Sequence, residues 1–167
     1  MPYLNEEFYG QEENDKIKKL ISITASVKKW AEEHKEIRID DYKNSKTYIR
    51  FRTGYMDKLI PDTENNLSGW NTGNHYFYEI RNMNGRTLYI QLAFSSKNII
   101  NEQRELTQQI YMTETGKEFD PKWEYLIPFK TQKKHLDETA SEESVYQAMD
   151  ECMNEIMSFE KELASKI

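Results

Sequence analysis

Hydrophobic residues recur every three to four positions in three stretches of the chain, which is the spacing of one face of an α-helix. These stretches predict helices over residues 13–35, 99–114 and 141–165. Gly116 follows the second stretch and is suited to end a helix in the left-handed conformation. Ser141 precedes the third stretch, where a hydroxyl can cap the first free backbone amides.

Between the first and second stretches the hydrophobic period changes to two, which is typical of β-strands. The alternation predicts strands over residues 47–52, 75–82 and 86–94. A further strand is expected from Trp123 to Phe129, and its proline places it at an edge of the sheet.

The Asn84-Gly85 pair predicts a hairpin between the second and third strands. A two-residue loop would mix polar and apolar residues on both faces of the sheet. A three-residue loop that begins at Met83, with Gly85 left-handed, pairs Ile80 with Leu88 and gathers the aliphatic side chains on one face. We therefore expect the three-residue loop.

The segment from residue 60 to 74 is rich in turn-forming residues and is too long for a simple connection. Trp70 either pins this loop to the core or presents its ring to a partner. Pinning is favoured, because a tryptophan buries so much apolar area.

Together these elements predict a single α+β domain over residues 1–167. A small antiparallel sheet of three to four strands, within residues 47–94, packs its apolar face on three helices. The length of 167 residues and the low count of four prolines fit one folded domain. One cysteine excludes an internal disulfide framework, and no group of residues has zinc-site spacing. With no signal peptide or apolar run of membrane-spanning length, we expect a cytoplasmic protein without a membrane association or a cofactor.

Charge is distributed unevenly along the chain, whose formal net charge is −6. Residues 44–97 hold seven basic and four acidic residues, and they are the only block with a positive balance. The same block holds nine of the 21 aromatic residues. Arginine can bind phosphate while aromatic rings stack on bases, so this block is the candidate nucleic-acid surface. The candidate binding residues are Arg50, Arg52, Trp70, Arg81, Arg86 and Tyr89. The alternative is a solvated sheet face, or one covered by a helix whose acidic side chains pair with the arginines.

Asp62, followed by Glu79 and Arg81, invites comparison with the metal-dependent nuclease pattern, in which two carboxylates hold Mg²⁺ beside a lysine. Arginine cannot act as a base, so we expect Glu79 to pair with Arg81 or with an arginine on a neighbouring strand.

The three histidines are far apart in the sequence, which argues against a metal site. His34 and Cys152 fall on apolar helix faces and are expected to be structural. Met149, Met153 and Met157 are expected to fill the core, or else to form an adaptable docking surface.

The middle of the chain also resembles the C-terminal region of bacterial PD-(D/E)XK nuclease superfamily proteins. The resemblance covers the chain from about residue 40 onward. Its residues are Tyr48-Ile-Arg-Phe-Arg52, Thr53-Gly-Tyr-Met-Asp-Lys-Leu-Ile-Pro61, Ser68-Gly-Trp-Asn71, Tyr76-Phe-Tyr-Glu-Ile-Arg-Asn82, Ile90-Gln-Leu-Ala-Phe-Ser-Ser-Lys-Asn98 and Arg104.

The resemblance implies an accessory domain in a nuclease-associated context. In that family the nuclease core precedes this region, so the resemblance transfers no catalytic residue. The first functional hypothesis is therefore a non-catalytic accessory module that binds DNA or RNA. The second is a protein-interaction module that holds a nuclease domain or its own copy through the acidic C-terminal helix, with Phe159 in the interface. The third is a degenerate divalent-metal nuclease.

Overall fold

The computed structural model describes residues 2–40 and 48–167, and it has the predicted α+β architecture. In chain order the elements are α1 (Pro2–Glu32), β1 (Ile37–Asp40), β2 (Tyr48–Thr53), α2 (Gly54–Leu59), β3 (Tyr76–Met83), β4 (Thr87–Ser95), α3 (Asn101–Thr115), β5 (Tyr125–Lys130), β6 (Lys134–His135) and α4 (Glu142–Lys166). Helices α3 and α4, the three central strands and the strand with its edge proline match the sequence prediction, whereas α1 has the predicted type but different bounds. Residue 47, the predicted first residue of β2, lies outside the described residues.

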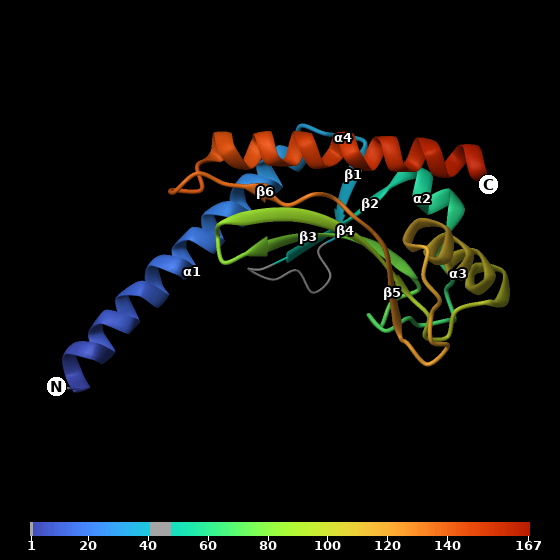
Figure 1. Cartoon of the computed structure of the whole chain (residues 1–167), viewed down its shortest axis with the longest axis horizontal. Helices are drawn as coiled ribbons and strands as arrows, with labels where there is room; N and C mark the ends of the chain where they lie inside the picture. Colours follow the sequence, from blue (N-terminus) through green and yellow to red (C-terminus); the bar gives the residue numbers. More distant parts are fainter. Residues whose placement is uncertain (1, 41–47) are drawn as a thin grey trace.

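All pairings in the sheet are antiparallel, and the strand order is β1-β2-β3-β4-β5, with β6 pairing to β4 (Figure 1). In the described ranges the sheet has six strands, more than the three to four predicted. The additional strands, β1 and β6, span only four and two residues. Segments this short carry too little alternation to be recognised in a sequence.

The hairpin between β3 and β4 has the predicted faces but a different register. Ile80 lies opposite Ile90 rather than Leu88, and the three-residue loop runs from Asn84 to Arg86. Asn84 and Gly85 both adopt positive φ, of 57° and 69°. The loop therefore starts one residue later than predicted, which shifts the pairing by two residues. A shift of two keeps each side chain on its face, so the predicted division into an apolar and a polar face is confirmed.

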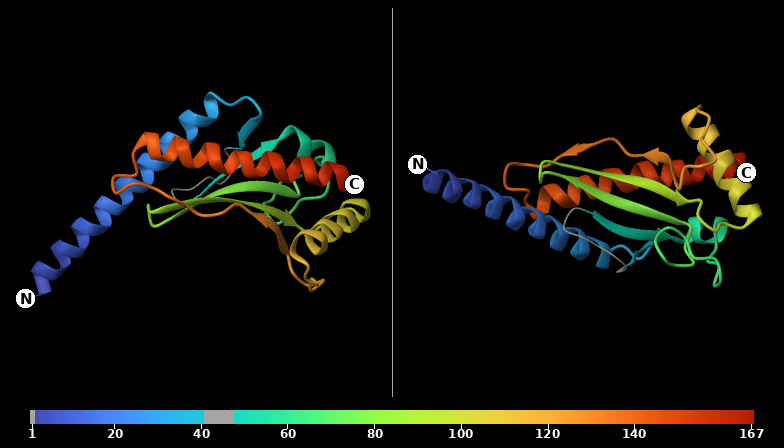
Figure 2. Two further views of the ribbon diagram at one scale, coloured as in Figure 1. Left: turned by 45° about the horizontal axis from the view of Figure 1, so that its top comes forward. Right: turned by 90° about the horizontal axis from the view of Figure 1, so that it is seen from below.

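The main core lies between the apolar face of the sheet and the two long helices α1 and α4, which cross that face (Figures 1 and 2). Trp30 of α1 is almost fully buried there, and its indole Nε1 donates to Asp150 Oδ1 of α4 at 2.9 Å. His34 stacks on Trp30 with ring centroids 3.8 Å apart and is only partly buried, which agrees with a structural role. No helix in the ranges that the structure describes has the length and apolar character needed to cross a bilayer.

The helix ends carry the capping features read from the sequence. Ser141 Oγ accepts a hydrogen bond from the Ser144 amide at the start of α4, and Gly116 ends α3 with φ of 65°. Within α4, Cys152 is fully buried, and burial raises the pKa of its thiol to about 11. The cysteine is thus a structural core residue, as expected.

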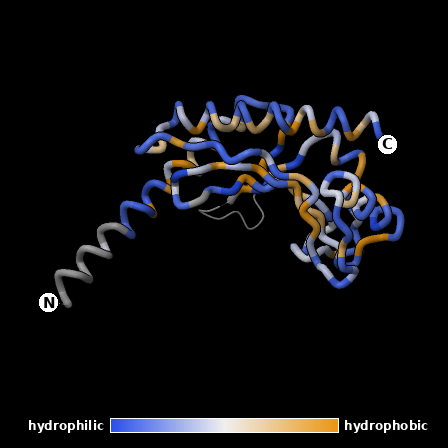
Figure 3. The backbone as a smooth tube through the Cα atoms, viewed as in Figure 1, coloured by the Kyte–Doolittle hydropathy of each residue, from blue (hydrophilic) through white to orange (hydrophobic). Residues whose placement is uncertain are grey.

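The first half of α1 extends away from the sheet, while its second half crosses the core (Figures 1 and 2). The helix begins at Pro2 and ends at Glu32, earlier at both ends than the predicted range of 13–35. Hydrophilic residues dominate where α1 leaves the sheet, near the β3–β4 loop (Figure 3). This position brings the polar side of α1 beside the hairpin end of the sheet.

Candidate nucleic-acid interface

Arg50, predicted to lie on an exposed polar face, is instead part of a buried polar row. The strand register aligns Arg50 of β2, Glu79 of β3 and Gln91 of β4 across the sheet. Arg50 Nε lies 3.3 Å from Glu79 Oε2, and Gln91 Nε2 donates to Glu79 Oε1 at 3.0 Å. Because Arg50 is only 6% exposed, its guanidinium group lies inside the protein rather than on its surface. Arg50 thus pairs with an acidic side chain, as the alternative predicted, but this carboxylate belongs to β3 and the Trp70 ring of the neighbouring loop, rather than a helix, lies against the arginine.

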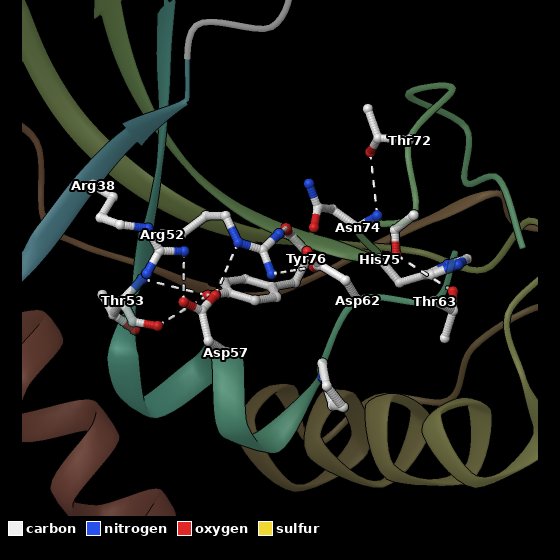
Figure 4. A network of polar contacts seen from close by, with 12 residues as sticks. Arg38, Arg52, Thr53, Asp57, Asp62, Thr63, Thr72, Asn74, His75 and Tyr76 are labelled. Atoms are coloured by element: carbon white, nitrogen blue, oxygen red, sulfur yellow. Dashed lines mark hydrogen bonds and ion pairs between the residues drawn. The ribbon is translucent and has the colours of Figure 1, made fainter. Parts of the chain in front are cut away.

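Arg52 is also buried, and it holds three segments together (Figure 4). Its Nε donates to Asp57 of α2 and its Nη2 to Asp62, both at 2.9 Å. Its Nη1 donates to the carbonyl oxygen of Tyr76 in β3 at 3.2 Å. All three nitrogens of the guanidinium are therefore engaged with other groups of the protein.

Asp57 is the centre of this network (Figure 4). Besides Arg52, it binds Arg38 of β1 and accepts a hydrogen bond from the Tyr76 hydroxyl. Burial alone would raise the pKa of the Asp57 carboxyl, but the hydrogen bonds from Tyr76 and Arg38 and the charge of Arg52 hold it below its usual value. An ionised Asp57 joins β1, β2, β3 and α2 at this corner of the sheet.

Trp70 pins its loop to the polar face of the sheet, the arrangement favoured from the sequence. Its side chain packs edge-on against Phe77, with ring centroids 4.9 Å apart, and lies 5.3 Å from the Tyr125 ring. Only 6% of Trp70 is exposed. The ring is therefore not presented for stacking on a base, contrary to its inclusion among the binding candidates.

The loop around Trp70 is held by its own hydrogen bonds. The Thr63 amide donates to the Gly73 carbonyl at 2.9 Å, and the Ser68 amide donates to the Thr72 carbonyl at 2.8 Å. The buried His75 ring lies between the carbonyl oxygens of Asn66 and Ser95. This loop is an ordered part of the fold.

The two carboxylates of the nuclease-like pattern are engaged in separate ion pairs. Asp62 binds Arg52, whereas Glu79 binds Arg50 and Gln91. Within the described ranges no group of three or more histidine, cysteine, aspartate or glutamate side chains has the geometry of a metal site. The expected pairing of Glu79 with an arginine of a neighbouring strand is confirmed.

The hydrophobic stripe of α4, the interface of the second hypothesis, faces the core. Met149 and Met153 are buried, and Phe159 stacks on Phe129 with ring centroids 4.2 Å apart. Met157 is 59% exposed and lies off the stripe. Phe159 is therefore a packing residue in this fold rather than part of an exposed docking surface.

Glu160 of α4 is a carboxylate placed against the apolar face of the sheet. It accepts hydrogen bonds from the hydroxyls of Thr53 and Tyr78, at 2.8 and 3.0 Å. Burial raises the pKa of the Glu160 carboxyl, and the nearby charge of Asp57 raises it further, against the effect of the two hydrogen bonds. The folded state therefore binds a proton at Glu160 more readily than the unfolded chain does.

This shift predicts a pH-dependent gain in stability for Glu160→Gln. A raised carboxyl pKa means that ionised Glu160 destabilises the fold above that pKa, and that the penalty disappears as the pH falls through it. Glutamine keeps an oxygen acceptor and carries no charge. We expect Glu160→Gln to unfold at a higher temperature than the wild type at pH 7, with the difference shrinking toward pH 4. Thermal unfolding followed by circular dichroism would measure this, and a pH-independent loss of stability would contradict it.

The remaining candidates, Arg81, Arg86 and Tyr89, lie together at the hairpin end of the sheet. Arg86 is exposed in the hairpin loop, and Arg81 lies opposite Tyr89 on the polar face. The structure therefore divides the predicted set into a buried group around Arg50, Arg52 and Trp70 and an accessible group at the hairpin.

A groove of about 490 Å³ separates the hairpin loop from α1 and is strongly basic. Its lining residues are Asp15, Lys16, Lys19, Asn84 and Arg86. A side-chain carbon built on Gly85 would lie 3.0 Å from Lys19 Cδ, so glycine at this left-handed position allows the lysine stem to approach the loop closely. Three cations from two different elements thus surround one groove beside one carboxylate.

Tyr89 follows the groove residue Arg86 by three positions, on the polar face of β4, and its ring is in contact with a cation. Lys133 Nζ is 5.9 Å from the centre of the Tyr89 ring, within the range of a cation–π contact. Lys133 is brought there because the following strand, β6, pairs with the start of β4. The ring is partly exposed, in contrast to Trp70.

Lys16, Lys19 and Lys133 were not among the residues singled out from the sequence. The three-residue spacing of Lys16 and Lys19 does place them on one side of the predicted helix. Nothing in the sequence shows that this side faces the hairpin loop, because that contact depends on how α1 crosses the sheet. Lys133 depends in the same way on the two-residue strand β6.

Comparisons of this chain with models of protein families, with curated proteins and with solved structures give no match.

Proposed function

We propose that this chain is a non-catalytic accessory module that binds nucleic acid through the basic groove between α1 and the β3–β4 hairpin. The observation that carries the proposal is the convergence of Lys16, Lys19 and Arg86 on one groove. Lysine and arginine side chains that converge from separate elements are suited to bind successive phosphates.

The charge distribution favours the groove, rather than the centre of the sheet, as the binding site. Arg50 and Arg52 each pair with buried or partly buried carboxylates, so a phosphate would have to displace an existing ion pair. Arg86 and Lys16 are exposed, and the groove that they line holds a single acidic residue, Asp15. On a chain of net charge −6, such a local basic site should give modest affinity that depends strongly on salt.

The association with a PD-(D/E)XK nuclease system is the second part of the proposal. It rests on the similarity of the chain, from about residue 40 onward, to the C-terminal region of PD-(D/E)XK nuclease superfamily proteins. A module that holds nucleic acid without cutting it would position a substrate for a nuclease core on the same or another chain.

The proposal predicts salt-sensitive binding that the variant Lys16→Ala/Lys19→Ala/Arg86→Ala lacks. Fluorescence anisotropy with labelled DNA and RNA, at about 50 and 200 mM salt, would measure it. We expect the triple variant to bind about tenfold more weakly or worse at the lower salt concentration, with a smaller dependence of affinity on salt.

A charge-matched control separates the groove from the overall charge of the protein. Lys117, Lys122 and Lys161 are exposed and line no part of the groove. Their triple alanine variant changes the net charge by the same amount and should bind as the wild type does. Equal losses in the two triple variants, or no binding by the wild type at low salt, would contradict the proposed site.

A further inference from the structure

The partly exposed ring of Tyr89 adds a feature to the groove that phosphate binding alone does not need. Tyr89 points to the face of the sheet opposite the core, because its neighbours Leu88 and Ile90 are fully buried on the core side. Arg81 lies opposite Tyr89 on β3, and Lys133 Nζ lies 5.9 Å from the ring centre. An aromatic surface is thus set between two cationic side chains.

The spacing of Arg86 and Tyr89 along the chain suits a flexible strand. Tyr89 follows Arg86 by three residues, and in an extended strand this places the two positions about 10 Å apart. A nucleic-acid strand whose phosphates lie in the groove could therefore continue around the hairpin tip and bring a base to the ring.

The chemistry of the ring distinguishes single strands from duplexes. Stacking on a tyrosine requires a base whose flat face is free, and such a face is available in single strands and not within a base-paired stack. A site that needed only a duplex backbone would gain nothing from Tyr89.

We propose that the groove prefers single-stranded nucleic acid, with phosphates bound by Lys16, Lys19 and Arg86 and one base stacked on Tyr89. This inference rests on the proposed function and names its ligand class. Arg81 and Lys133 attract the phosphates on either side of the stacked base.

The test compares Tyr89→Leu and Tyr89→Phe with the wild type and with the groove triple variant. The probes are a labelled 12-nucleotide oligothymidylate and a labelled DNA duplex of equal length, measured by anisotropy at low salt. We expect the wild type to prefer the single strand, Tyr89→Phe to retain that preference, and Tyr89→Leu to lose about 5- to 100-fold in affinity for the single strand alone. Circular dichroism and thermal unfolding of each variant confirm that the fold is intact.

The possible failures are distinguishable. If the groove triple variant loses binding while Tyr89→Leu binds both probes as the wild type does, the single-strand inference is overturned and the proposed function stands. An equal loss for both probes in Tyr89→Leu would also overturn the inference. If the wild type binds neither probe, both the inference and the proposed function are overturned.

Discussion

Replacing Arg52 by methionine is expected to destabilise the protein by about 1–3 kcal/mol, the usual cost of leaving buried or partly buried acceptors without their donor. The Arg52 side chain is 6% exposed and bonds Asp57, Asp62 and the Tyr76 carbonyl. Without it, Asp57 keeps its charge in a partly buried site and the Tyr76 carbonyl loses a donor. Urea unfolding followed by circular dichroism would give the change in the free energy of unfolding.

Arg38 provides the matched control, because it binds the same carboxylate from an exposed position. Its side chain is 61% exposed and lies 2.6 Å from Asp57 Oδ2. Solvent screens such a pair, so Arg38→Met should cost about 1 kcal/mol or less. Should Arg52→Met fail to fold, Arg52→Lys keeps the charge without the planar fork and should be intermediate. Equal costs for Arg38→Met and Arg52→Met would contradict the role assigned to Arg52.

Gly73→Ala is the second change with a large expected effect, for steric reasons. A Cβ atom at this position would lie 2.4 Å from the backbone oxygen of Thr63, which cannot rotate away as a side chain could. To relieve this clash, residues 63 and 73 would have to move apart, and the hydrogen bond from the Thr63 amide to the Gly73 carbonyl would be weakened. We expect a cost of about 1–3 kcal/mol, measured by thermal unfolding, and faster hydrogen exchange at the Thr63 and Ser68 amides.

Gly54→Ala is the control for this substitution. The corresponding Cβ would meet no atom within 4 Å, at the first residue of α2. Alanine at a compatible position restricts the unfolded chain, so this variant should be neutral or stabilised by up to about 1 kcal/mol. If Gly73→Ala costs as little stability as Gly54→Ala, residues 63 and 73 are not held close together in the loop.

The sequence predicted the parts of the fold that depend on periodicity. Spacings of three to four and of two located the long helices and the central strands, and the alternation of Ile80, Leu88 and Ile90 assigned the faces of the hairpin correctly. The register was wrong by two residues, because the pattern is unchanged by such a shift and only the backbone conformation of Asn84 and Gly85 decides between the alternatives.

The candidate site was predicted less completely, because burial and proximity arise from tertiary packing. Arg50 and Arg52 are charged residues on a polar face, a pattern typical of exposed positions. Their burial depends on Glu79, on Asp57 and on the loop that carries Trp70, whose places are not visible in the sequence. Arg86 and Tyr89 were identified, whereas the lysines that complete the groove became apparent only when α1 was placed beside the hairpin.

The buried thiol of Cys152 provides an internal probe of local unfolding. It is the only cysteine in the chain, it is fully enclosed between α4 and the sheet, and its raised pKa leaves little reactive thiolate at neutral pH. A thiol reagent should therefore modify the chain only when α4 separates from the sheet. The rate of modification in native buffer then reports the free energy of that opening, which allows the Arg52 and Gly73 variants to be ranked without denaturant.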